Sequence, residues 1–365
     1  MKVAMVNLVR PQPGSGDGLT EYAWQIYSKL RKSADIDLIY PLEKLKMQDT
    51  LGILYANSLF RLKVRKLAKG NYDVIHITHP ELGFVAKMLK EKGTRARIVS
   101  SVHDLMRLDK GFHKGIMQGA YNLVVSANIG NAIRYSDMII FTSSAVKNEV
   151  LQRFRGEIKN WRITLLGTKD RFLAAKIPKK KKRKTFVIGY VGALIFRKNV
   201  IFILKTAEQL KSQGSNFKFL IYGSGDQKEH LMAYKAEKKL DNVEFMGFAP
   251  EGKLMHIYDS FDAFIWPSVS DSSSFPIEDA KARGLPIIVS KENKFDVEVT
   301  RYAYVAQDAS DAAKRIMYLR KHGYDDKMRK QALAYAKSIS WSNTARKTLE
   351  AYKDVLKVRT KRYSE

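Results

Sequence analysis

Short apolar runs alternate with longer amphipathic segments along the chain, and this alternation starts again in the second half. Apolar runs of this length predict buried β-strands, and the segments between them predict helices. The expected strands are residues 2–8, 35–40, 73–78, 96–102 and 137–142 in the first half and 186–192, 217–223, 242–247, 261–266 and 285–290 in the second. The sequence therefore predicts an α/β protein with two doubly wound domains, which normally bind ligands at the carboxyl ends of their strands, in the cleft between them.

Length and composition agree with two domains. The 365 residues suit two domains of ordinary size, and 45% of them are hydrophobic, which is enough to form cores. The chain has no cysteine, so disulfides and thiolate metal sites are excluded. No uncharged apolar run is long enough to span a membrane, and the first residues predict a strand rather than a signal peptide.

The chain is strongly basic. It has 65 lysine and arginine residues against 37 acidic ones, which gives a net charge of +28. A charge of this size favours an anionic partner, such as a membrane surface, a nucleic acid or a phosphorylated substrate. No signature of an RNA-recognition, KH or zinc-finger module appears, so a nucleic-acid partner is not expected.

A basic run separates the two halves. Residues 175–185, AKIPKKKKRKT, contain a proline and six consecutive cations, which repel one another and resist packing. We expect an exposed linker here, between a first domain at residues 1–174 and a second at residues 186–344. A localisation signal or a nucleic-acid patch would have the same composition.

Acidic residues gather in one stretch of this basic chain. Residues 267–286, PSVSDSSSFPIEDAKARGLP, follow an expected strand. Pro276 suits the first turn of a helix and Gly284 suits its end. A helix is therefore expected at about 276–283, after a serine-rich loop.

The three acids of this stretch need different explanations. Glu278 and Asp279 are expected in the first helical turn, where the helix dipole stabilises negative charge. Asp271 lies upstream in the loop, where the dipole does not account for it. With Asp271 in the loop and Asp279 on the helix, both carboxylates can face one cleft, with backbone N–H groups between them. Such a site matches a nucleotide sugar. The carboxylates would accept hydrogen bonds from the sugar hydroxyls at its two ends, and the N–H groups would bind the diphosphate between them.

Two turns that follow strands of the second half suit a phosphate. Arg197 and Lys198 precede a helix expected near Asn199, and a cation pair beside a helix N-terminus suits a diphosphate. A solvated basic turn would contain the same residues. Gly223 and Gly225 permit a tight turn and a close backbone approach, as they do in many turns that bind no ligand.

Several motifs follow one another in a characteristic order. The second half contains GYVGALIFRKNV, LIYGSGD, NVEFMGF and PSVSDSSSFPIEDAKARGLPIIVS. In this order they resemble the donor domain of glycosyltransferase family 4. The segments QPGSGDGLTEYAWQIYSKL, SVHDL, FTSSAVKNEV and ITLLGTKDRF look like motifs of the family's first domain, and ISWSNTARKTLEAYKDVL is similar to its closing helices.

The resemblance implies a fold and an activity. The fold is GT-B, with two Rossmann-like domains facing a central cleft and a last helix, at about 345–365, that packs back on the first domain. The activity is that of a hexosyltransferase-like enzyme that uses a nucleotide sugar, retains the anomeric configuration and needs no metal or other cofactor.

The resemblance also implies roles for single residues of the second half. Asp279 would bind the ribose hydroxyls, and Asp271 would contact the donor sugar near the reaction centre. Arg197 and Lys198 would neutralise the diphosphate as it leaves. Further donor contacts would come from Gly223 and from the backbone of Ser273, Ser274 and Phe275.

In the first half, the resemblance points to a glycine loop and a histidine. Gly16 and Gly18 would let this loop approach the phosphates, and His103 would lie over the donor sugar. A histidine at the end of a strand is otherwise more often a structural group.

Three departures from the family pattern stand in the donor motifs. Asp271 and Asp279 replace two glutamates at the same spacing, Ala193 stands where many members have arginine, and residues 272–274 are serines in place of Gly-Phe-Gly. These departures bear on which donor the protein uses and on how active it is, more than on its fold. The sequence therefore keeps open an alternative, a decayed GT-B scaffold that binds a membrane or a polyanion.

Two further patterns predict structure rather than a metal site. The acids of DID, residues 35–37, lie in an expected strand, which is a better explanation than a metal-binding DxD motif. His76 and His79 have no third ligand nearby, so zinc is not expected.

The acceptor side is marked by a basic amphipathic segment. Residues 53–70 mix apolar side chains with the cations Arg61, Lys63, Arg65, Lys66 and Lys69. Such a helix can lie on an anionic membrane, or it can pack its apolar side in the core of the first domain. The sequence thus predicts a glycosyltransferase that uses a UDP- or GDP-sugar and a lipid-linked or other glycan acceptor. We expect it in the cytoplasm, peripheral on the inner face of the cell membrane.

Overall fold

The computed structural model describes most of the chain, which divides into two compact units. The described residues are 1–13, 18–41, 43, 50–103, 116–154, 156–178, 184–211, 216–269, 271, 274–292 and 300–357. The first unit contains residues 1–166 and 341–365, and the second contains residues 167–340. Each unit has its own parallel sheet, as the alternation in the sequence predicts, and each sheet has six strands where five were expected.

The sheet of the first unit has the strand order β2-β1-β3-β4-β5-β6. Its strands are β1 (Lys2–Val6), β2 (Asp35–Ile39), β3 (Val74–Ile77), β4 (Arg97–Val102), β5 (Met138–Phe141) and β6 (Trp161–Ile163). Every residue of β3 and β5 is buried. Parallel strands with helices on both faces bury both of their sides, which is why β5 is a continuous apolar run and β3 is interrupted only by the buried His76.

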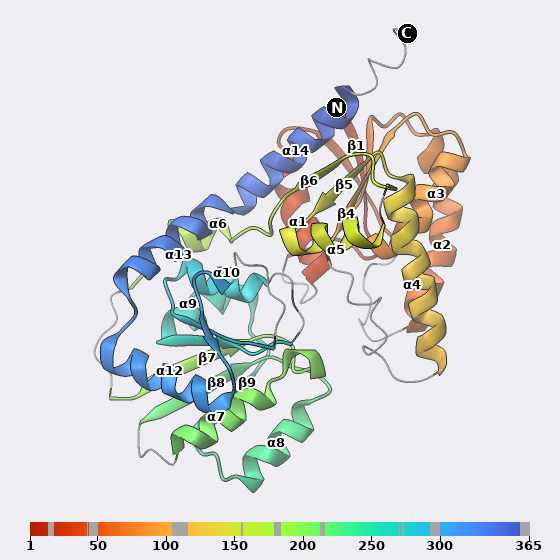
Figure 1. The fold of residues 1–365 in the computed structure, drawn as a ribbon. Coiled ribbons are helices and arrows are strands. Elements are labelled where there is room, and N and C mark those ends of the chain that lie inside the picture. Colours follow the sequence, from red (N-terminus) through yellow and green to blue (C-terminus); the bar gives the residue numbers. More distant parts are fainter. Residues whose placement is uncertain are drawn as a thin grey trace. The chain divides into compact units, whose positions relative to one another are not determined.

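Helices of the first unit pack in two groups around this sheet (Figure 1). α1 packs against α14, and α3 packs against both α2 and α4. Their bounds are α1 (Gly18–Leu30), α2 (Thr50–Lys69), α3 (Gly83–Glu91), α4 (Ile116–Tyr135), α5 (Ser144–Arg153) and α14 (Trp341–Lys357), with a 3-10 turn η1 at Pro80–Leu82.

Helix α14 joins the first unit from far along the chain. Tyr352 Oη lies 2.6 Å from His76 Nδ1 in β3, and the Trp341 ring meets the Tyr22 ring edge-on, with the centroids 6.0 Å apart. Thr344 Oγ1 donates to Leu165 O at 2.8 Å. The helix begins before the expected position of about 345, because Trp341 and Thr344 already pack in the first unit.

The sheet of the second unit has the strand order β12-β11-β10-β7-β8-β9. Its strands are β7 (Phe186–Val191), β8 (Phe217–Tyr222), β9 (Val243–Gly247), β10 (Ala263–Trp266), β11 (Ile287–Ser290) and β12 (Tyr304–Ala306). The helices and 3-10 turns are α6 (Asp170–Ala174), η3 (Phe196–Lys198), α7 (Ile201–Lys211), α8 (Lys228–Glu237), η4 (Glu251–Lys253), α9 (Leu254–Ser260), α10 (Phe275–Ala282), α12 (Ala309–His322) and α13 (Asp326–Ser338).

The second unit begins earlier in the chain than the sequence predicts. The expected boundary at residue 174 falls inside this unit, because the Phe172 side chain is fully buried in its core. The Phe172 and Ala175 carbonyls accept from Arg283 Nη1 at 2.9 and 3.0 Å. The chain crosses between the units at residues 166–167 and 340–341. The expected linker at 175–185 is therefore not the crossing point, and its residues 179–183 lie outside the described residues.

Candidate functional site

The second sheet has a topological switch point between β7 and β10. From β7 the chain proceeds through β8 to β9, and it then returns to add β10, β11 and β12 on the other side of β7. In open α/β sheets, ligands bind at such a point, beyond the carboxyl ends of the strands. The loops after β7 and β10 meet there, since Val269 N donates to Arg197 O at 2.9 Å and Ser268 Oγ donates to the same oxygen at 3.1 Å.

Asp271 lies between two cations in these loops. Its Oδ1 is 2.6 Å from Arg197 Nη1, and its Oδ2 is 2.6 Å from Lys198 Nζ. The Trp266 indole N–H donates to Oδ2 at 3.1 Å. We call Arg197, Lys198 and Asp271 the ion cluster of the switch point. The structure thus brings together three of the residues that the sequence nominates for the reaction.

The aromatic ring of Trp266 supports the ion cluster. Lys198 Nζ lies 4.5 Å from the centroid of this ring, within the range of a cation–π contact. Trp266 also stacks on Tyr190, with the centroids 5.3 Å apart and the planes inclined by 19°. The ammonium group is therefore held in place by a carboxylate and by a ring that is itself packed in the core.

The ion cluster keeps a surplus of positive charge. Burial has the largest effect on Asp271 and acts to raise its pKa, but Lys198 and Arg197 together outweigh burial, so the pKa lies below its ordinary value. An ionised Asp271 balances one of the two cations. The Arg197 side chain is 29% exposed, so its guanidinium can also bind an anion from solvent.

The turn that presents these cations differs from the predicted one. The helix expected near Asn199 begins instead at Ile201, as α7, and Arg197 and Lys198 lie in the 3-10 turn η3. Asn199 has left-handed backbone angles, φ 49° and ψ 41°, which a helix cannot contain. The left-handed residue separates the cations from the helix.

The acids of α10 are buried. The helix covers Phe275–Ala282, after the extended residue Ser274, close to the expected 276–283. Glu278 and Asp279 are each only 3% exposed. The helix dipole that the sequence offers as their explanation is therefore not their main partner, because buried carboxylates need paired cations. Each of the two acids has a lysine of its own.

Asp279 is paired with a lysine from the start of the second unit. Lys169 Nζ donates to Asp279 Oδ2 at 2.8 Å. Burial has the largest effect on the pKa of Asp279 and raises it above its ordinary value, while Lys169 opposes this shift. The carboxylate keeps further acceptor positions, since one ammonium uses only one of them.

Glu278 is paired with a lysine of its own helix. Lys281 Nζ donates to Glu278 Oε1 at 3.1 Å, and the Lys281 side chain has no exposure to solvent. The same ammonium lies 4.5 Å from the centroid of the Tyr335 ring in α13. This buried pair connects α10 to α13, and it gives Glu278 a structural role.

Gly223 is required by the neighbouring loop. Its φ is +149°, and a Cβ atom at this position would lie 1.8 Å from Gly192 O. The backbone also bonds to the end of β9, because Gly223 N donates to Gly247 O at 2.7 Å. This packing needs a glycine whether or not a ligand approaches.

The first unit contains the remaining nominated residues. His103, at the end of β4, is 9% exposed; its Nε2 lies 3.1 Å from Thr78 O, and its ring meets Tyr22 edge-on at 4.5 Å. Gly18 is the first residue of α1. Gly16 and Ser273 lie outside the described residues.

A second histidine next to this region, His76, has a structural role that the sequence does not signal. His76 is buried, and its Nδ1 and Nε2 lie 2.6 Å from Tyr352 Oη and 2.8 Å from Ser101 Oγ. Burial, and to a lesser extent the charge of His103, lowers the pKa of His76 to about 3. A histidine that stays neutral and has a partner on each nitrogen is a structural link between β3, β4 and α14.

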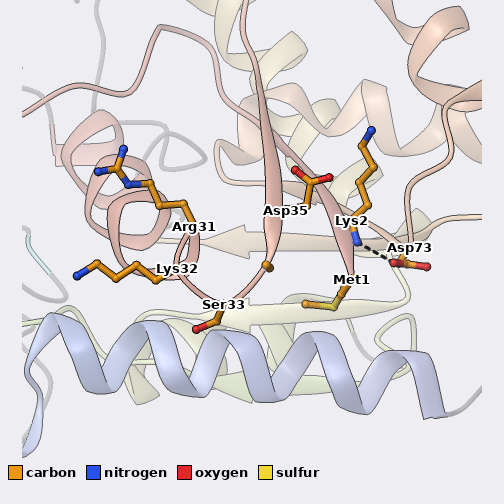
Figure 2. Close-up of a pocket in the computed structure, with 8 residues that line it drawn as sticks. Met1, Lys2, Arg31, Lys32, Ser33, Asp35 and Asp73 are labelled. Atoms are coloured by element: carbon orange, nitrogen blue, oxygen red, sulfur yellow. Dashed lines mark hydrogen bonds between the residues drawn. The ribbon is translucent and has the colours of Figure 1, made fainter.

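A hollow of about 500 Å³ lies elsewhere on the first unit (Figure 2). Its lining includes Lys2 and Asp35, the first residues of β1 and β2, and Lys2 N donates to Asp73 Oδ2 at 2.7 Å. The hollow is thus at the amino ends of these strands. Parallel sheets bind their ligands at the opposite ends, so we do not assign this hollow to the candidate site.

The described part of the chain contains no group of three or more histidine, cysteine or acidic residues placed to hold a metal ion. Within the same residues, no helix has both the length and the apolar character needed to cross a bilayer.

Two protein-family models match the chain. The model described as Glycosyltransferase Family 4 matches residues 14–167, and the model described as Glycosyl transferases group 1 matches residues 173–338. The O-antigen chain mannosyltransferase B of Escherichia coli is 25% identical over 171 residues, which are 45% of each chain. The matches span between 26% and 58% of the length of the curated relatives.

Solved structures match over almost the whole chain. Sucrose-phosphate synthase from Thermosynechococcus elongatus has a TM-score of 0.76 at 16% identity, and the match covers 98% of this chain and 99% of that one. Anabaena HepE in complex with UDP and glucose has a TM-score of 0.72 at 15% identity, and covers 97% and 99%. At this level of identity, the similarity identifies the fold.

Proposed function

Because the chain belongs to the family 4 glycosyltransferases and has their GT-B fold, we propose that it transfers a sugar from a nucleotide-sugar donor to a glycan acceptor. The ion cluster of the switch point is the observation that carries this proposal, since it places two cations where a doubly wound sheet binds its ligand. The donor is a UDP- or GDP-sugar. UDP is the first candidate, because HepE has been solved with UDP and glucose.

The reaction develops negative charge on the diphosphate as it leaves. Arg197 and Lys198 would stabilise this charge, and their positions are fixed beforehand by Asp271 and Trp266. Cations positioned in advance stabilise a transition state because they need no reorganisation during the step. This strategy needs no metal ion.

The other nominated residues would hold the donor. Asp279 would accept from the ribose hydroxyls, the backbone from Ser273 to Phe275 would contact sugar and phosphate, and His103 would contact the sugar. We expect the acceptor to attack from the face that the nucleotide leaves, so that the anomeric configuration is retained.

We propose a lipid-linked acceptor and a cytoplasmic enzyme peripheral on the inner membrane face. Helix α2 supports this: its described residues Phe60, Val64 and Leu67 are buried in the first unit, and its cations point to solvent. The exposed cations of α2 are Arg61, Lys63, Arg65, Lys66 and Lys69, and Leu62, which lies among them, is 77% exposed. A basic face with an exposed leucine suits an anionic membrane surface.

Thermal unfolding with UDP, GDP and ADP tests the donor, because a ligand of the folded state raises the apparent stability by mass action. We expect one of the first two to raise the melting temperature, and the matching nucleotide sugar to release nucleoside diphosphate in the presence of enzyme. Stabilisation without any release would indicate the alternative, a decayed scaffold that only binds. Stabilisation by none of the three would refute the proposed function.

A further inference from the structure

The first segment of the second unit is fixed at both of its ends. Thr168 N donates to Ile339 O at 2.9 Å. The buried Arg283 side chain donates to the carbonyls of Phe172, Ala175 and Lys176 at 2.9–3.0 Å and also pairs with Asp259. The backbone at Lys169 therefore has a defined position against α10.

Lys169 uses this position to reach the acid nominated for ribose binding. Its Nζ lies 2.8 Å from Asp279 Oδ2 and 3.6 Å from Glu251 Oε2. The side chain is only 11% exposed, and its ammonium lies 5.4 Å from the centroid of the Phe172 ring. The ammonium thus bridges two acids that come from different elements, α10 and η4.

We propose that Lys169 is a positioning residue for nucleotide binding: it orients the Asp279 carboxylate and keeps it ionised, so that the carboxylate accepts hydrogen bonds from the ribose hydroxyls. This inference rests on the proposed function, because it assumes a nucleotide at Asp279. Lys169 itself acts through Asp279 and does not touch the nucleotide.

The charges around Asp279 explain why a lysine is needed. Burial has the largest effect and raises the pKa of Asp279, Glu251 raises it further, and Lys169 and Arg171 lower it. The neighbouring Tyr258 stays neutral, since burial raises its own pKa well above the ordinary value. Without Lys169, burial and Glu251 act almost unopposed, and the carboxylate takes up a proton at a higher pH.

A protonated Asp279 accepts fewer hydrogen bonds than the carboxylate does. Nucleotide affinity should therefore be highest when Asp279 is ionised. In the wild type, affinity should fall only when the pH drops through the pKa of Asp279. In Lys169→Met this fall should begin at a higher pH. Lys169→Arg keeps a cation at the same place and should restore most of the wild-type behaviour.

The experiment measures binding of UDP and of 2′-deoxy-UDP by calorimetry from about pH 5 to about pH 9, with GDP and 2′-deoxy-GDP if GDP is the nucleotide that stabilises the wild type. The variants are Lys169→Met, Lys169→Arg and the control Lys218→Met. Lys218 pairs with Glu244 on the surface of β8 and β9, and it is 40% exposed, so its replacement changes the net charge equally. Thermal unfolding checks that each variant is folded, and Lys169→Gln, which also removes the charge, replaces Lys169→Met in the test if that variant does not fold.

We expect Lys169→Met to bind UDP about tenfold more weakly at the low end of the range, the loss that one charge-assisted hydrogen bond would cause. It should also lose most of the preference for UDP over 2′-deoxy-UDP, while Lys218→Met keeps both. An unchanged pH profile together with an unchanged preference would overturn the inference and leave the proposed function standing. Binding of no nucleoside diphosphate by the wild type would refute both.

Discussion

Replacing Glu278 by alanine should destabilise the second unit, because Glu278 is the partner of a lysine that is completely buried. The Lys281 ammonium lies 3.1 Å from Glu278 Oε1, and the side-chain exposures of the two residues are 0% and 4%. Alanine would remove the carboxylate that lies against this buried ammonium. The ring of Tyr335, 4.5 Å from Nζ, would be a weaker substitute.

The size of the effect follows from the burial. Removing one partner of a buried ion pair typically costs about 3–5 kcal/mol in the free energy of unfolding. For a domain of this size, each kcal/mol lowers the melting temperature by about 2–4 °C. We therefore expect Glu278→Ala to lower the melting temperature of the second unit by about 10 °C.

Thermal and urea unfolding of three variants measure this effect. Glu278→Ala should show the full loss, and Glu278→Ala with Lys281→Met should recover much of it, because apolar residues of similar volume can replace a buried ion pair. Glu244→Ala is the control, since Glu244 pairs with Lys218 on the exposed surface of the second unit and such pairs contribute little. A loss for Glu278→Ala as small as the control's would show that Lys281 does not need its carboxylate, and the reasoning would be refuted.

Three further predictions concern the site and the membrane. Arg197→Ala with Lys198→Ala should weaken binding of a nucleoside diphosphate far more than of the nucleoside, by roughly 1.5–3 kcal/mol for each charged bond in calorimetry; equal losses would place the cations away from the diphosphate. In steady-state kinetics with the identified donor, Asp279→Ala should chiefly raise the donor KM, whereas Asp271→Ala should chiefly lower kcat, since it releases the two cations that stabilise the leaving diphosphate; the opposite assignment would exchange their roles. The protein should bind anionic vesicles through α2 in co-sedimentation, and the binding should weaken as salt is added. Each cation at the surface should contribute about 1 kcal/mol to the binding free energy. Equal binding to neutral vesicles would exclude an electrostatic contact.

Most of the fold could be predicted because its strands are continuous apolar runs. β6 (Trp161–Ile163) and β12 (Tyr304–Ala306) were not predicted, since three residues at the edge of a sheet have too little periodicity to detect. The position of Phe172 in the second core could not be predicted either. The basic run looks like a domain boundary in the sequence, but the second unit already begins at Gly167, and Phe172 is part of its core.

The candidate site was predicted in part. The resemblance to a family nominated Asp271, Arg197 and Lys198. Arg197 and Lys198 lie 74 and 73 residues before Asp271 in the chain, so no local pattern could have shown that they pair with it. The partners of the α10 acids were not predicted. Lys169 is 110 residues from Asp279, and Lys281 looks like one of many surface lysines until the packing of α13 is known.

The return of α14 to the first unit has a consequence for the order in which the protein can fold during synthesis. The contact between His76 and Tyr352 joins residues 276 positions apart, and α1 also needs α14 to cover it. The whole second unit is made between these two partners, so it can fold while the first unit still lacks its last helix. Domains usually fold as they emerge from the ribosome, the N-terminal one first; here the unit that begins the chain is the last to be completed, and the buried face of α1 must stay soluble, or be protected by a chaperone, until residue 352 has emerged.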